Sequence, residues 1–131
     1  MKSKLFFWML VLSIITFVKC SSSDSSPNTV TSQFKNKWWY SIHHAVVKHY
    51  FNSNGTYELV NSLGGIPTHS VGQWEWIDEP NKTFRVYNLI DNPDAEHYGK
   101  ILNLTEHDLQ IAISFDNGVT YEPYDYMDVG D

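Results

Sequence analysis

Short segments of alternating apolar and polar residues, each ended by a turn sequence, constrain this chain most strongly. Residues 109–115 (LQIAISF) carry a large apolar side chain at every second position, and the sequence DNG follows at 116–118. A second Asn-Gly pair at 54–55 separates VVKHYF (46–51) from TYELV (56–60). Side chains on a strand alternate between its two faces, and Asn-Gly favours a tight hairpin turn. We therefore expect antiparallel hairpins, with one face of the strand at 109–115 formed by Leu109, Ile111, Ile113 and Phe115.

Similar segments follow one another along the rest of the chain. Residues 61–69, with two glycines and a proline, are expected to form a loop, and residues 42–50 are the one place where a helical turn would fit. In the segment 83–90, Phe84, Val86 and Ile90 should share a face that Asn88 interrupts. The predicted strands are residues 38–42, 46–51, 56–60, 71–77, 83–90, 98–105, 109–115 and 119–126.

Consecutive antiparallel strands joined by short turns close readily into a barrel, which leaves no strand edge exposed. We therefore predict an all-β fold, a single up-and-down antiparallel β-barrel of about eight strands, with a β-sandwich as the alternative.

The N-terminal residues have the pattern of an export signal. Lys2 and Lys4 precede an uncharged, mostly apolar run at 5–18 (LFFWMLVLSIITFV), which fits a signal-peptide core and is short for a membrane span of about 20 residues. The serine-rich sequence SSSDSSP at 21–27 is typical of a flexible tether. We predict a signal peptide at 1–19, a tether at 20–33 and one barrel domain at 34–131; a buried core helix at 5–18 is the alternative.

Cys20 is the only cysteine in the chain, so it cannot form an intrachain disulfide. It could end a removed leader, remain a free thiol or carry a lipid. Residues 17–20 (FVKC) resemble a bacterial lipobox, although Phe17 and Lys19 differ from its usual residues. The resemblance implies diacylglycerol on Cys20, cleavage before it and acylation of the new amino group. We expect a membrane-anchored protein of the cell envelope, on the outer membrane or the periplasmic face, with a soluble secreted protein as the alternative.

Charge and motifs argue against several functions. Three of the nine basic residues precede Cys20, whereas all fifteen acidic residues follow it, and so acidic a body would repel nucleic acid. The chain lacks the Gly-x-Ser-x-Gly, His-Glu-x-x-His and phosphate-binding glycine motifs, and we expect no enzyme activity. Neither strand nor helix spacing brings two of His43, His44 and His49 onto one metal, so we expect scattered surface histidines, no metal and no cofactor.

Several segments together resemble small lipocalin-like lipoproteins of Bacteroidetes-type bacteria. They are residues 34–38 (FKNKW), 50–57 (YFNSNGTY), 72–76 (GQWEW), 101–105 (ILNLT) and 109–111 (LQI), in the order and spacing of that family. Asn36 stands where the family has glycine, and asparagine tolerates positive φ better than most residues. The resemblance implies a lipocalin-like barrel, a fold that often encloses a small apolar ligand.

Aromatic residues supply the candidate binding site. Trp74 and Trp76 are two residues apart on one predicted strand and should share a face, with Trp38 as a partner from the first strand. The residues expected to line a cavity for a small hydrophobic ligand are Trp38, Trp74, Trp76, Phe84 and Tyr87. Alternatively, these rings simply fill the barrel. A third possibility is that the acidic, tyrosine-rich end (Tyr121, Tyr124 and Tyr126) docks a partner, or that it is a final strand.

Overall fold

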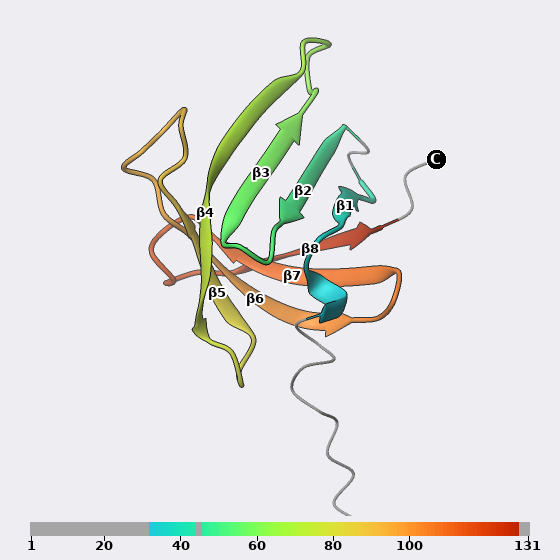
Figure 1. The fold of residues 1–131 in the computed structure, drawn as a ribbon, viewed down its shortest axis with the longest axis vertical. Helices are drawn as coiled ribbons and strands as arrows, with labels where there is room; N and C mark the ends of the chain where they lie inside the picture. The colour runs from blue at the N-terminus through green and yellow to red at the C-terminus, as the bar shows by residue number, and fades with distance from the viewer. Residues whose placement is uncertain (1–31, 44–45, 129–131) are drawn as a thin grey trace, which may run out of the picture.

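The computed structural model describes residues 32–43 and 46–128 (Figure 1). The predicted signal peptide, Cys20 and most of the predicted tether lie outside these ranges. The described part of the chain contains no helix long and apolar enough to cross a membrane.

Eight antiparallel strands form one closed barrel, in which each strand pairs with its neighbours in sequence and the last pairs with the first. This confirms the predicted all-β, eight-stranded up-and-down barrel rather than a sandwich. The strands are β1 (Trp38–Ser41), β2 (Val47–Phe51), β3 (Thr56–Asn61), β4 (Thr68–Asp78), β5 (Thr83–Tyr87), β6 (His97–Leu104), β7 (Asp108–Ser114) and β8 (Glu122–Met127).

Strand ends differ from the predictions where the backbone turns early. β5 ends at Tyr87 because Asn88 adopts a positive φ of 53°, so Ile90 is 70% exposed and does not share a face with Phe84 and Val86. β7 ends at Ser114, which leaves Phe115 62% exposed rather than in the inward row. β4 begins at Thr68, inside the predicted loop, because its first residues continue the ladder with β3. The described part of 42–50 contains strand β2 and no helical turn.

The Asn-Gly pair at 54–55 lies in the expected short turn between β2 and β3, whereas the pair at 117–118 lies in a longer loop, residues 115–121, because β8 begins at Glu122 and not at 119 as predicted. Asn36 adopts the positive φ expected at its position. Gly55, Asn117 and Gly118 have φ values of 89°, 59° and 83°, a region that glycine adopts freely and asparagine more readily than most L-residues. Asn36 has φ 61°, and its side-chain Oδ1 accepts a hydrogen bond from the amide of Ser53 at 2.8 Å. This hydrogen bond therefore ties the segment that leads into β1 to the turn between β2 and β3.

One end of the barrel is closed by Phe34, which lies at the end of a short helical turn before β1 (Figure 1, cyan). Its side chain is fully buried, and its ring centroid lies 4.4 Å from that of Phe51 and 5.5 Å from those of Trp74 and Phe84. The indole Nε1 of Trp39 donates a hydrogen bond to the Phe34 carbonyl at 2.9 Å. The helical turn is therefore tied to the barrel by packing and by a buried hydrogen bond.

The seam between β1 and β8 has the shortest ladder of any neighbouring strands, with two residue pairs. Additional contacts extend it beyond the strands. The Ile42 amide donates to the Asp125 carbonyl at 3.0 Å, and the Lys37 ammonium lies 2.9 Å from the Asp128 carboxylate. The same ammonium lies 4.6 Å from the ring centroid of Trp39. Lys37, which precedes β1, thus helps to join β1 to β8, while Phe34 closes the end of the barrel.

Replacing Phe34 with alanine should lower the free energy of unfolding by about 3–5 kcal/mol, because the surrounding rings cannot collapse fully into the space. The matched control is Phe115→Ala, the same chemical change at an exposed site, for which we expect a loss below about 1 kcal/mol. Urea unfolding followed by tryptophan fluorescence measures both. Equal losses in the two variants would contradict the role given to Phe34.

Candidate functional site

The half of the barrel away from Phe34 encloses a cavity of about 260 Å³ that opens to solvent at its far end. Its floor is formed by Phe51, Phe84 and Ile111, which also belong to the packed core. Gly99 brings Phe84 close to the wall, since a Cβ there would lie 2.2 Å from the Phe84 ring. The lining contains no Lys, Arg, Asp or Glu among the described residues, and it is mostly apolar or aromatic.

His49 and Tyr57 form the central polar pair in this cavity. Nδ1 of His49 lies 2.6 Å from the Tyr57 hydroxyl, and the His49 ring meets the Tyr126 ring edge-on, with centroids 5.1 Å apart. All three residues line the cavity. Burial lowers the pKa of His49 to about 4, so the ring is neutral near pH 7. Burial also raises the pKa values of Tyr57 and Tyr126, which keeps both phenols protonated.

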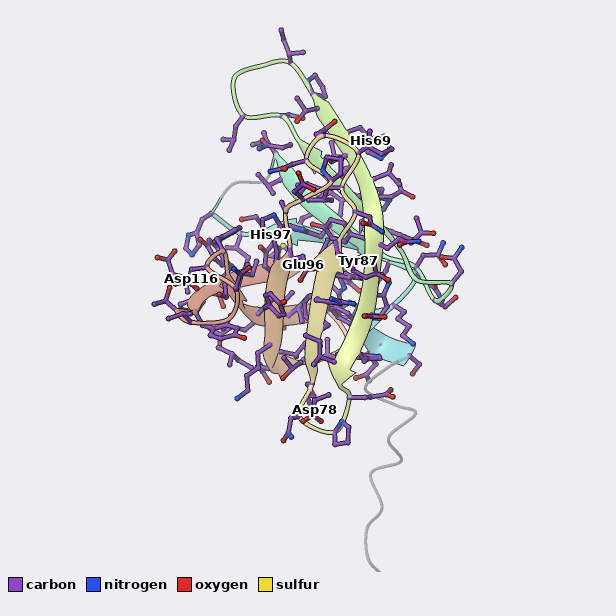
Figure 2. All side chains as sticks on the ribbon, turned by 90° about the vertical axis from the view of Figure 1, so that its left-hand side faces the viewer. His69, Asp78, Tyr87, Glu96, His97 and Asp116 are labelled. Carbon is purple, nitrogen blue, oxygen red and sulfur yellow. The ribbon has the colours of Figure 1, made fainter. Side chains whose placement is uncertain are left out.

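His97 lines the cavity nearer its mouth, at the start of β6 (Figure 2). Its ring lies edge-on to that of Phe115, with centroids 5.1 Å apart. The ring atom Nδ1 is buried and has no hydrogen-bond partner among the described residues. Burial lowers the pKa of His97 as well. Both cavity histidines are therefore held in an environment that disfavours the charged form.

Apolar side chains gather in the four loops around the open end, namely β1–β2, β3–β4, β5–β6 and β7–β8. Eight of the ten exposed large hydrophobic residues in the described ranges lie there: Ile42, Val46, Leu63, Ile66, Ile90, Phe115, Val119 and Tyr121. In Figure 1 the β3–β4 loop stands at the top of the view, far from the cyan helical turn at the closed end. Clustered exposed apolar residues commonly mark an interaction or ligand-binding surface, and we call this set the apolar rim.

Two carboxylates stabilise the loops of the apolar rim. Asp116 accepts hydrogen bonds from the amide and hydroxyl of Thr120, at 2.8 Å and 2.5 Å, and from the hydroxyl of Ser114 at 2.7 Å. These bonds hold the pKa of Asp116 well below its usual range. In the β5–β6 loop, Asp91 accepts a hydrogen bond from the Ser70 hydroxyl. The loops beside the mouth are thus organised by polar contacts while they present apolar side chains outward.

Of the five residues predicted to line a cavity, Phe84 does so and the other four lie elsewhere. Trp38 is on the outer surface, beside Tyr50, because β1 turns Trp39 rather than Trp38 toward the core. Tyr87 is also on the outside, with the Arg85 guanidinium 4.6 Å from its ring centroid.

The remaining two, Trp74 and Trp76, share the inward face as expected, with ring centroids 5.4 Å apart. They pack around Phe34 at the closed end, not around the cavity. Trp74 Nε1 donates to the Asn52 carbonyl at 2.8 Å, whereas Trp76 Nε1 is buried without a partner among the described residues. For these two residues the structure agrees with the alternative that aromatic rings fill part of the barrel.

The polar pair was not predicted from the sequence. The prediction of surface histidines is wrong for His49, which lines the cavity, and Tyr126 was predicted to belong to a docking edge or a final strand. The structure shows a final strand, since β8 completes the barrel and turns Tyr124 and Tyr126 into the cavity. The signal for His49 was present, because it lies two residues before the inward-facing Phe51 on the same strand.

Within residues 32–43 and 46–128, no three His, Cys, Asp or Glu side chains come together as a group that could hold a metal ion. No protein-family model and no curated protein matches this chain significantly. The cavity and its polar groups are therefore the basis for a functional proposal.

The neutral His49 should make stability depend on pH. Its pKa is about 6.5 in an unfolded chain and about 4 in the barrel, so the unfolded state binds an extra proton between these values. The free energy of unfolding should fall as the pH falls from about 6.5 to about 4, by up to about 3 kcal/mol from this residue alone. The groups that face the ring (Phe51, Tyr57 and Tyr126) carry no charge that would offset this effect.

Comparing the wild-type protein with His49→Gln isolates this contribution, because glutamine does not titrate. Urea unfolding at several pH values between 4 and 7 should give a steeper slope for the wild type over this window. Parallel curves for the two proteins would show that His49 is not buried in its neutral form.

Proposed function

We propose that this chain is a membrane-anchored lipoprotein of the cell envelope whose barrel binds a small apolar or amphipathic molecule without catalysis. The observation that carries the proposal is the apolar cavity at the open end of a barrel whose other end is packed solid. Small-molecule sites are typically concave and mostly apolar, with a few polar groups that orient the ligand. The His49–Tyr57 pair within an otherwise apolar lining fits that description.

The size of the cavity limits the ligand. A cavity of about 150 Å³ can hold benzene, so by proportion one of about 260 Å³ accommodates about ten non-hydrogen atoms. A longer molecule would extend through the mouth and contact the apolar rim. A structural module with a filled barrel and no ligand is the rival function, and the hollow half of the barrel favours binding over it.

A binding role is also the better fit to the chemistry of the lining. The described lining residues supply neither a carboxylate nor a lysine or arginine. Burial favours neutral His49 and protonated Tyr57, so neither group is poised to carry charge at neutral pH. General acid–base catalysis works best with groups whose pKa values lie near the operating pH, and these are shifted away from it.

The proposed anchor would leave the mouth of the barrel accessible. Phe34, the first predicted residue of the domain, lies at the closed end. A flexible tether of the predicted length spans roughly 20 Å on average. Lipid chains on Cys20 would therefore attach the protein by the end opposite the cavity, because the tether joins the barrel there.

Blocking the cavity should abolish binding. Val47 lines the cavity, and Val47→Phe places extra ring volume inside it. We expect an environment-sensitive naphthalene dye to bind the wild-type protein saturably, with one molecule per chain, and to bind Val47→Phe at least tenfold more weakly. Fluorescence titration of the mature protein measures both affinities.

The control is Val60→Phe, the same substitution on the outer face of β3, since Val60 alternates with the cavity residues Leu59 and Asn61. It should retain the wild-type affinity. No saturable binding across a broad panel of dyes and lipids would contradict the proposed ligand-binding function.

The anchor is tested separately by mass spectrometry of the mature N-terminus. We expect a chain that begins at Cys20 and carries a diacylglycerol thioether and an amide-linked acyl group. Cys20→Ser should shift the protein from the membrane fraction to the soluble fraction. An unmodified chain beginning at Ser21 would refute lipidation and leave the cavity proposal intact.

A further inference from the structure

The His49–Tyr57 pair has more hydrogen-bond donors than it uses within the pair. A neutral imidazole carries one N–H and a phenol carries one O–H, but a single hydrogen bond joins the two side chains. One hydrogen lies between Nδ1 and the phenol oxygen, so the other has no acceptor inside the pair. No other hydrogen bond connects either side chain to the described residues. The pair therefore keeps one spare donor, whichever tautomer it adopts.

The surroundings decide which atom carries that donor. If His49 donated to Tyr57, the O–H of Tyr57 would need another acceptor, and a buried unsatisfied hydroxyl is costly. If Tyr57 donates to Nδ1, its hydroxyl is satisfied and the imidazole carries its hydrogen on Nε2. Both residues line the cavity, but Tyr57 is only 5% exposed and His49 is less deeply buried. The second arrangement therefore leaves the spare donor on His49, the side chain that a ligand reaches more readily.

Charge then limits which acceptor can occupy the cavity. A carboxylate would accept from Nε2–H, but no cationic side chain of the described lining compensates its charge. An ion without a counter-charge is strongly disfavoured in an apolar environment. The phenol groups of Tyr57 and Tyr126 would add dipoles but no positive charge. A hydrocarbon fits the apolar walls but leaves the donor without an acceptor.

We propose that the cavity selects neutral molecules that carry a hydrogen-bond acceptor of the carbonyl class, with Nε2–H of His49 donating to the carbonyl oxygen. This assignment rests on the proposed ligand-binding function and specifies the class of ligand. The apolar part of the ligand lies against Phe84, Ile111 and Ile113, and the carbonyl points toward β2.

Three compounds of ten non-hydrogen atoms each test this selection: butylbenzene, propiophenone and phenylacetate. They match the size of the cavity and differ mainly in polarity and charge. Competition against the naphthalene dye at pH 7.5 gives their affinities for the mature protein. We expect propiophenone to bind about tenfold more tightly than butylbenzene, as one neutral hydrogen bond implies, and at least tenfold more tightly than phenylacetate.

Variants separate the donor from general packing. His49→Phe should reduce the preference for propiophenone over butylbenzene to less than about twofold, while His69→Phe should leave it unchanged. His69 is an exposed histidine that contacts Glu58 on the outer surface, so it provides the same chemical change outside the cavity. Nitrogen-15 NMR of the wild-type imidazole provides a second measurement that does not depend on the variant folding. It should show hydrogen on Nε2 and a shift of that nitrogen when propiophenone binds.

The following results would contradict the proposed class of ligand. Equal or tighter binding of butylbenzene, tighter binding of phenylacetate, or hydrogen on Nδ1 would overturn the ligand class and leave the proposed binding function standing. Failure of the dye and all three compounds to bind would overturn both.

Discussion

The packing of Phe34 into the end of the barrel is the contact on which the rest of this structure depends. The interior of an eight-stranded barrel is just wide enough to be filled by side chains or to hold one small ligand. Phe34 gathers Phe51, Trp74 and Phe84 at one end, and this concentrates the large rings there. Because the aromatic core is concentrated at that end, the opposite half can remain hollow. The same packing holds the N-terminal helical turn, through which any tether must join the barrel.

The strand pattern made most of the fold predictable. Alternation in residues 109–115 and the Asn-Gly turns directly encode hairpins, and consecutive hairpins have few ways to close. The number of strands, their order and their antiparallel pairing therefore followed from local sequence. The strand ends did not, because they depend on single backbone dihedrals such as the positive φ of Asn88. Residues beyond such a turn, including Ile90, lose their place on the inward face.

The candidate site was less predictable because it depends on which face of each strand points inward. Trp38 and Trp39 are adjacent and similar, so periodicity alone cannot decide between them. The register of β1 with its neighbours settles the choice in favour of Trp39, which also bonds to Phe34. Trp74 and Trp76 face inward as expected, but their position along the barrel axis places them at the packed end, around Phe34, and not in the cavity. The position of a residue along this axis depends on how all eight strands pair, and no single segment of the sequence encodes that pairing.

The packed end of the barrel offsets the loss of stability caused by His49 and the cavity at the open end. A buried neutral imidazole and an open cavity both cost stability, since the ring gives up hydration and the walls give up packing partners. The aromatic core at the closed end offsets these costs, because its rings bury large apolar areas and pack edge-on at favourable distances. An acceptor that enters the cavity would recover part of the cost at the open end by pairing with the spare donor. Part of the binding free energy would then come from giving a hydrogen-bond partner to a polar group that folding has already desolvated. The same desolvation of His49 would therefore lower folding stability and raise ligand affinity.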